Sequence, residues 1–262
     1  MPKATNQYYE DEKAKWDSLV DAHYAQNPEK LLLRPEQDFY SYVRTDKVAS
    51  AYPGTKDFFG DIRGKRLLEY GCGSGMTASL LAKAGADVTA FDISEKSVAT
   101  TQLRAQLNNL PNLHAQVGVG EELPFPDASF DLAFGRAVLH HLDVDLAGPE
   151  LLRVLKPGGK ALFIESLGMN PVLTYVRNHV PYPDKNPVGD DRPLTYAEIN
   201  KWGRGYSDFH YHEVHFFGMI VRAFPYRWHV RLPVLHKVDR VVLRYAPPLR
   251  RFCRYVLIML EK

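Results

Sequence analysis

From Lys65 onward, short apolar segments alternate with longer stretches in which apolar residues recur every three or four positions. The apolar segments, each of which predicts a buried strand, are Arg66–Tyr70, Asp87–Phe91, Leu113–Val117, Phe130–Phe134 and Lys160–Glu165. The stretches between them predict helices at about Ser74–Lys83, Glu95–Asn108 and Gly148–Leu155. Such alternation is typical of an α/β fold, in which helices cover both faces of a parallel sheet.

The segments on either side of this alternating region have different patterns. Helical spacing over Tyr8–Tyr24 and over about Glu36–Ser50 predicts an N-terminal helical cap. Residues 180–194 are rich in proline and predict an irregular loop. Two further candidate strands, Ser207–Phe216 and Cys253–Glu261, complete a Rossmann-like sheet of seven mostly parallel strands.

A basic and apolar helical stretch from about Phe217 to Arg251 forms an insertion before the last strand. The expected organisation is therefore a cap over residues 1–60 and a Rossmann-like core over residues 61–262, with lid or acceptor-side elements at 170–204 and 217–251.

The composition excludes several classes of protein. The chain has 262 residues, of which 45% are hydrophobic and 24% charged, as in an ordinary globular domain. Its net charge of +2 is too small for a domain that binds nucleic acid. Two cysteines, Cys72 and Cys253, cannot form a disulfide framework, which fits a reducing compartment. Because neither a signal-peptide core nor a run of about 18 apolar residues is present, we expect a cytoplasmic protein without a membrane span.

The strongest chemical signal is a glycine-rich loop directly after the strand at Arg66–Tyr70. The sequence LLEYGCGSG leads from this buried strand through Gly71, Cys72, Gly73 and Gly75 into a helix. Glycines let the backbone turn sharply and let a ligand approach it, and the N-terminus of the helix adds unpaired N–H donors. A tight turn without a ligand would have the same sequence, so the loop alone is not specific.

Asp92 makes the signal more specific. It ends the next strand, VTAFD, about twenty residues after the loop begins, where an acid can accept hydrogen bonds from both hydroxyls of a ribose. Enzymes that use NAD share this feature, but their glycine spacing is G-x-G-x-x-G and their helix faces a pyrophosphate. Here the spacing is G-x-G-x-G, and Glu69 lies two residues before the first glycine. A negative charge at that point suits a cationic sulfonium amino acid better than a pyrophosphate.

Residues 65–166 resemble the class I S-adenosylmethionine-dependent methyltransferases of the small-molecule, type 11-like group. The motifs that carry this resemblance are LLEYGCGSG, AFDIS, EELPFPDASFDLAFGRAVLHHL and LLRVLKPGGKALFIES. The resemblance implies S-adenosyl-L-methionine as the cofactor, S-adenosyl-L-homocysteine as its product, and no metal ion.

The resemblance also implies a role for each part of the cofactor pocket. The loop from Gly71 to Gly75 would pass the methionine moiety, Asp92 would hold the ribose, and Ile93 would pack against the adenine. Arg136 and Ala137, after the fourth strand, would lie beside the methionine end.

The stretch from Gly118 to Glu121 would border the edge of the adenine. Many relatives carry an Asp there that contacts the adenine amino group, but this chain has Val119. We therefore expect the backbone groups of Gly120 or Glu121 to recognise the adenine.

The N-terminal segment YYEDEKAKWDSL resembles the cap helix of such enzymes. Two interpretations of its aromatic residues stay open. Tyr9 or Trp16 closes over the cofactor, or both are core positions of an amphipathic helix.

Three residues are candidates for catalysis. His140 and His141 follow the fourth strand at the edge where open α/β sheets bind ligands, and histidine titrates near neutral pH, as a general base requires. The alternative is that a histidine here caps or packs the turn. We favour His141 as the one that faces the ligand. Glu165, at the end of the fifth strand, binds either the substrate or the neighbouring loop.

Other polar clusters do not predict a metal site. In a strand, His210 and His212 share one face while His215 lies on the other, which is poor geometry for tetrahedral zinc. The pair Asp190–Asp191 lies in the proline-rich loop, where solvated charges are the simpler interpretation.

The basic and apolar stretch near the C-terminus has two interpretations. It is either a lid helix with an apolar underside, or an amphipathic surface that touches a membrane and admits a lipid-like, apolar acceptor. The lid is favoured because VLIMLEK fits the last strand of a class I enzyme.

The sequence as a whole predicts methyl transfer to a small-molecule acceptor of metabolic or natural-product chemistry, with O-methylation favoured over N- or C-methylation. Two other classes stay open, a nicotinamide-dependent oxidoreductase and a non-catalytic partner protein on the same fold. Neither the acceptor nor the oligomeric state follows from the sequence.

Overall fold

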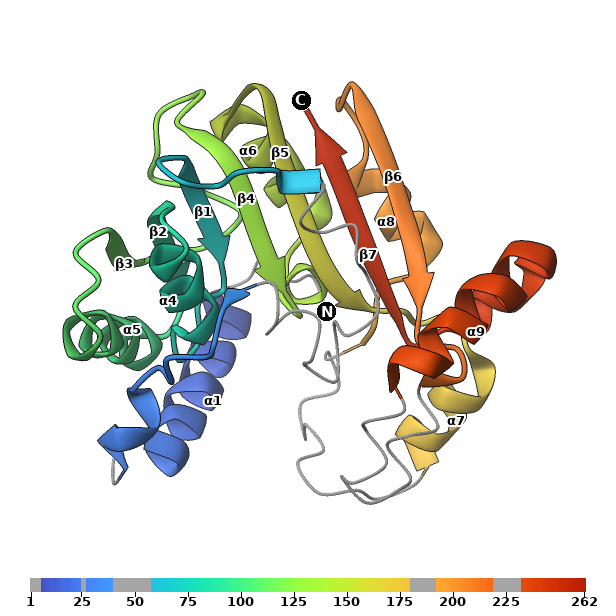
Figure 1. Ribbon diagram of the computed structural model, residues 1–262, viewed down its shortest axis with the longest axis horizontal. Helices are drawn as coiled ribbons and strands as arrows, with labels where there is room; N and C mark the ends of the chain where they lie inside the picture. Colours follow the sequence, from blue (N-terminus) through green and yellow to red (C-terminus); the bar gives the residue numbers. More distant parts are fainter. Residues whose placement is uncertain (1–5, 25–26, 40–57, 180–191, 219–231) are drawn as a thin grey trace.

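The described residues form a sheet of seven mostly parallel strands, as predicted. The computed structural model describes residues 6–24, 27–39, 58–179, 192–218 and 232–262 (Figure 1). The strands are β1 (Arg66–Tyr70), β2 (Asp87–Asp92), β3 (Leu113–Val117), β4 (Phe130–Arg136), β5 (Leu155–Ser166), β6 (Asp208–Val214) and β7 (Tyr255–Glu261). Their order is β3-β2-β1-β4-β5-β7-β6. β7 runs antiparallel to β5 and β6, and the other pairs are parallel, which confirms the predicted fold class.

Helices cover both faces of this sheet. The described helices are α1 (Asn6–Tyr24), α4 (Met76–Lys83), α5 (Glu95–Leu107), α6 (Val144–Val154), α7 (Pro171–His179), α8 (Tyr196–Trp202) and α9 (Leu232–Tyr245), with short 3-10 turns η1 (Pro28–Leu31), η2 (Leu139–His141) and η5 (Pro247–Phe252). Successive strand residues belong to different cores, as expected for side chains that alternate across a strand. Leu67 packs with α4 on one face, whereas Leu68 packs with α6 and α8 on the other.

Most predicted boundaries lie within a few residues of the observed ones, and the larger differences have local causes. α6 begins at Val144 rather than Gly148 because the Asp143 side chain caps it, accepting the Asp145 backbone N–H at 3.0 Å. α8 was not predicted, although Thr195 and Glu198 form a capping box at its start.

α7 was not predicted either, and β5 begins at Leu155, five residues before the predicted start. The predicted helix at Glu36–Ser50 lies largely outside the described residues, as does most of the loop at 180–194.

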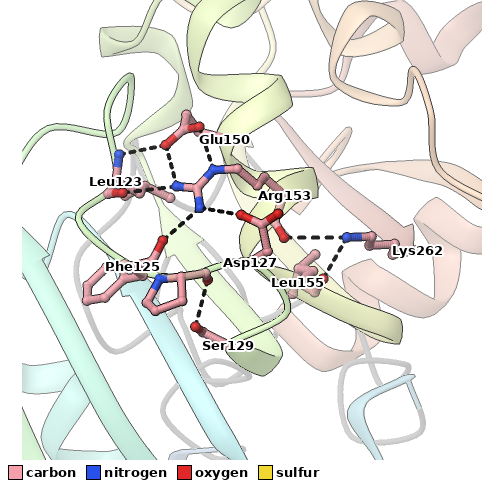
Figure 2. Close-up of polar contacts among 9 residues, drawn as sticks. Leu123, Phe125, Asp127, Ser129, Glu150, Arg153, Leu155 and Lys262 are labelled. Atoms are coloured by element: carbon pink, nitrogen blue, oxygen red, sulfur yellow. Dashed lines mark hydrogen bonds and ion pairs between the residues drawn. The ribbon is translucent and has the colours of Figure 1, made fainter.

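A network of hydrogen bonds and ion pairs around Arg153 fixes the connection between β3 and β4 (Figure 2). The Arg153 guanidinium donates to the carbonyl oxygens of Phe125 at 2.7 Å and Leu123 at 3.0 Å. Glu150 accepts from the Leu123 backbone N–H at 2.8 Å and also pairs with Arg153. Asp127 completes the group at 2.9 Å from Arg153. α6 therefore fixes the segment between β3 and β4. The first residues of this segment, from Gly118, border the site described below.

Gly75 is needed where the loop after β1 meets α5. Its φ is +74°, which L side chains rarely adopt, and a Cβ on it would lie 2.9 Å from the Thr101 Cα. Gly158 has a similar φ of +72° but faces open space.

We predict that Gly75→Ala lowers the free energy of unfolding by about 2–4 kcal/mol, whereas Gly158→Ala lowers it by about 1 kcal/mol. The larger loss in Gly75→Ala comes from the overlap of the new Cβ with Thr101, because the strain of a positive φ is common to both variants. Urea denaturation of both variants measures it, and equal losses would show that the close packing at Thr101 does not matter.

Candidate functional site

A cavity of about 410 Å³ lies at the carboxyl edge of β1, β2 and β4, between the loops that follow these strands and one face of α1. This is the edge at which open α/β sheets bind ligands, and the volume lies in the usual range for a ligand site. The cavity is lined by Tyr8, Tyr9, Glu12, Trp16, Tyr24, Glu69, Gly71, Cys72, Gly73, Ser74, Met76, Thr77, Phe91, Asp92, Ile93, Gly118, Val119, Gly120, Glu121, Arg136, Ala137, Val138, His141 and Leu142. Of the residues predicted to contact the cofactor, Gly75 alone does not line it, because it packs on Thr101.

Asp92 joins the loop after β1 to the end of β2. Its Oδ2 accepts the Gly73 backbone N–H at 2.8 Å, and its Oδ1 accepts the Ser94 backbone N–H at 3.0 Å. Burial raises the pKa of this carboxyl group, while the two backbone donors act in the opposite direction. Each oxygen retains lone pairs, so Asp92 can accept two further hydrogen bonds from a neighbouring pair of hydroxyls.

Glu69 supplies a second acid to the same cavity. It is 3% exposed, and burial, followed by the charge of Asp92, raises its pKa well above the usual range. Its Oε2 atom is buried without a hydrogen-bond partner among the described residues. A buried carboxyl group in this position is satisfied by a ligand that brings a positive charge or an N–H donor, and it offers no compensating charge to an anion such as a pyrophosphate.

The opposite end of the cavity is bordered by Gly118–Glu121 and Ile93. Glu121 accepts the Asp143 backbone N–H at 2.9 Å. Burial, followed by the interaction with Glu121, raises the pKa of Tyr9 to about 12, so the Tyr9 hydroxyl stays a donor at neutral pH. Apolar side chains, Ile93 and Val119, lie here beside the polar groups of Tyr9 and Glu121.

The helix α1 covers the cavity because it is tied to the start of α5. The Ser94 hydroxyl donates to Asp17 at 2.5 Å, and Lys13 pairs with Glu95 at 2.7 Å. Further along α1, the Tyr24 hydroxyl donates to the Ser74 hydroxyl at 3.2 Å. The structure thereby places Tyr9 and Trp16 against the cavity.

The turn after β4 separates the roles of the two adjacent histidines. Glu165 is fully buried, and its carboxylate accepts the backbone N–H groups of Val138 and Leu139, each at 2.8 Å. Its second oxygen lies 2.7 Å from His140 Nδ1. Glu165 and His140 are therefore held by the turn and do not line the cavity, whereas His141, one residue further, does.

Glu12 is a lining residue that the sequence did not single out. It lies on α1 and is 5% exposed. Its Oε2 accepts the Trp16 indole N–H at 3.0 Å and lies 3.3 Å from His141 Nδ1. The Trp16 and His141 rings meet edge to face, 6.0 Å apart. The sequence does contain one signal for the contact between Glu12 and Trp16, because residues four apart lie on the same face of a helix.

The polar residues considered for a metal site lie on β6, directly after it, and in the segment at 180–191. His210 and His212 lie on β6 with ring centroids 5.6 Å apart, and His215 is buried against Tyr255. Across the described residues, no group of three or more His, Cys, Asp or Glu side chains could hold a metal ion. Asp190 and Asp191 lie outside the described residues. In the part of the chain that the structure describes, no helix is long and apolar enough to cross a membrane.

The comparison with known protein families agrees with this geometry. Residues 68–163 match the family model described as a methyltransferase domain. This match covers the strands and loops that line the cavity, and the class of methyltransferase is taken up below as a proposal.

Curated relatives include an uncharacterized methyltransferase, YcgJ, of Bacillus subtilis, which is 31% identical over 54% of this chain and 55% of its own length. The ubiquinone biosynthesis O-methyltransferase of Alkalilimnicola ehrlichii is also 31% identical, over 49% of each protein. The chain thus spans about half the length of these relatives.

Similar solved structures extend over more of the chain. Geranyl diphosphate C-methyltransferase from Streptomyces coelicolor has a TM-score of 0.60, covers 98% of both chains and is 17% identical. The [4+2]-cyclase SpnF has a TM-score of 0.54, covers 88% of this chain and 84% of its own, and is 22% identical. At such identities the likeness concerns the fold.

Proposed function

We propose that the chain is an S-adenosylmethionine-dependent methyltransferase that acts on a small-molecule acceptor, with O-methylation favoured. The observation that carries this proposal is the pair of buried acids, Glu69 and Asp92, in one cavity. Their spacing along a glycine-rich loop suits a ligand with a cationic amino acid at one end and a ribose near the middle. The family match supports the same cofactor.

The residues of the cavity fit this cofactor end to end. The orphaned Oε2 of Glu69 would pair with the methionine ammonium group, beside Arg136 and the backbone of Gly71. Asp92 would accept the two ribose hydroxyls, and Ile93 would pack on the adenine. When bound, S-adenosylmethionine supplies a methyl group on a sulfonium sulfur, which is already activated for transfer.

Two observations favour O-methylation. A relative is named as an O-methyltransferase, and the cavity contains a candidate base. The ubiquinone biosynthesis enzyme is named as an O-methyltransferase. A hydroxyl acceptor must lose a proton during transfer, and a base in the cavity would take it. The name of SpnF shows that this fold also hosts other reactions, so the reaction itself requires a direct test.

We assign the role of general base to His141. It is the histidine of the adjacent pair that lines the cavity, and its Nδ1 faces the Glu12 carboxylate. Nε2 would accept the acceptor's proton, and the Glu12 carboxylate, 3.3 Å from Nδ1, would stabilise the imidazolium that forms. Glu12 acts as a positioning residue for His141. Trp16 packs on the same ring and helps to exclude water.

The state of Glu69 predicts how cofactor binding depends on pH. Because burial and the charge of Asp92 raise its pKa in the empty cavity, Glu69 holds its proton more tightly there than it would beside a bound ammonium group. Binding therefore releases a proton, and the affinity rises with pH until it passes the pKa of Glu69 in the free protein. Calorimetric titration with S-adenosylhomocysteine in buffers of different ionisation enthalpy measures this release.

Glu69→Gln should abolish the proton release and weaken binding about tenfold or more. Glu10→Gln removes an exposed acid from α1 and serves as the matched control, which should bind like the wild type. Proton release that persists in Glu69→Gln would contradict the assignment of Glu69.

The reaction is tested with methyl-labelled S-adenosylmethionine and an extract of the source organism as the supply of acceptors. We expect labelled product from the wild type, recovered by partition between organic and aqueous phases. His141→Ala should lower its rate of formation about 100-fold or more without weakening cofactor binding, because a lost base affects the chemical step.

Glu12→Gln should lower the rate less, and it should move the acid limb of the pH–rate profile to lower pH. The reason is that the imidazolium loses a neighbouring negative charge, so His141 stays neutral in more acidic solution. Glu29→Gln, an exposed acid on η1, is the control. An unshifted profile in Glu12→Gln would mean that Glu12 has a structural role only.

A further inference from the structure

An apolar stripe runs along the outer side of α9. Val234, Val238, Val241 and Tyr245 are between 42% and 80% exposed. Their spacing of three or four residues places them within roughly 60° of one another around the helix. Single exposed apolar residues are common on proteins, but four in one helical row form a continuous surface.

The opposite side of α9 is anchored, so the direction of the stripe is fixed. Asp239 is buried and accepts the backbone N–H groups of Phe217 at 2.7 Å and Phe216 at 3.1 Å, directly after β6. Leu243, one turn further, is buried in the hydrophobic core. Because these two residues hold α9 to the protein, the row from Val234 to Tyr245 points away from it.

Basic residues accompany the stripe along one margin. Lys237, Arg240 and Arg244 are exposed and follow one another at helical spacing beside it, and Arg250 and Arg251 of η5 are exposed next to the end of α9. Residues 232–254 contain six Lys or Arg and one acid, Asp239, which is buried. Since the whole chain carries +2, the other residues together are net negative, and positive charge is concentrated at this corner.

α7 adds a second exposed apolar group at the same corner (Figure 1). Val172, Tyr175 and Val176 lie on one face of α7 and are 40% to 64% exposed. Asn170 caps α7 and also donates to the Phe252 carbonyl oxygen of η5 at 2.8 Å, so α7 begins beside the end of η5. α7 contains no acidic residue.

We propose that the outer face of α9, with η5 and α7, docks on the surface of an anionic lipid bilayer. The apolar row would enter the boundary between headgroups and acyl chains, and the basic margin would contact lipid phosphates, as in interfacial amphipathic helices. A second copy of this chain is a poor partner for the face, because two equally positive surfaces repel each other.

This location also orients the cavity. β5 ends at Ser166 and β6 ends at Val214, and both residues pair with Tyr255 at the start of β7. α9 therefore lies at the carboxyl edge of the parallel strands, the edge that holds the cavity. A protein docked through α9 would present this edge toward the membrane. The docking itself does not depend on methyl transfer and needs no cofactor.

The test is co-sedimentation of the full chain, without cofactor, with vesicles of phosphatidylcholine alone or mixed with phosphatidylglycerol. We expect binding to the anionic vesicles that weakens in high salt, and little binding to the neutral ones. Val238→Asp/Val241→Asp should lower the partition coefficient more than tenfold. Lys237→Gln/Arg240→Gln/Arg244→Gln should lower it about 100-fold, at roughly fivefold for each charge.

The matched control is Leu103→Asp/Leu107→Asp, which changes two exposed leucines that lie one helical turn apart on α5 and should bind like the wild type. Failure of the wild type to bind anionic vesicles, or an equal loss in the α5 control, would overturn the proposal. So would dimerisation without lipid that Val238→Asp/Val241→Asp abolishes. Cofactor affinity, measured on the same samples, should be the same in all variants, which separates a failure of docking from a failure of the proposed function.

Discussion

The carboxylate of Asp92 accepts one backbone N–H from Gly73 and one from Ser94, and the shape of the cavity depends on these two hydrogen bonds. They lock the loop after β1 against the end of β2. The Ser94 hydroxyl oxygen caps α5 by accepting the Ser97 backbone N–H. The same hydroxyl donates its proton to Asp17 and so connects α1 to this group. Asp92 thus links the glycine-rich loop after β1 to the start of α5 and, through Ser94, to the helix α1 that covers the cavity.

The same acid sets the electrostatics of the cavity. Asp92 and Glu69 lie close enough that the charge of Asp92 raises the pKa of Glu69, and burial raises the pKa of both. Two buried acids in one cavity are costly unless a ligand compensates them. A ligand with a cation beside Glu69 and hydroxyl donors beside Asp92 does so at both points. This requirement favours a sulfonium amino acid nucleoside over a dinucleotide with a pyrophosphate.

Patterns along the chain were sufficient to predict the sheet and to single out most of the residues that line the cavity, because both depend on local sequence. The strands β1 and β3 have the predicted bounds, and the cavity is lined by Gly71–Ser74, by Asp92 and by Gly118–Glu121, the stretch that the family resemblance singled out. The contact between Glu12 and His141 could not be predicted, since it joins residues far apart in the sequence. The different roles of His140 and His141 depend on Glu165, which is also distant in the chain. α8 could have been found from its capping box.

The most direct test of the cofactor is equilibrium binding of S-adenosylmethionine and of NAD to the purified chain, measured side by side by calorimetry. We predict one site for S-adenosylmethionine and no binding of NAD, since Glu69 offers a buried carboxyl group, and no positive charge, to a pyrophosphate. Binding of NAD without binding of S-adenosylmethionine would contradict the assignment of the cavity and would favour a nicotinamide-dependent oxidoreductase.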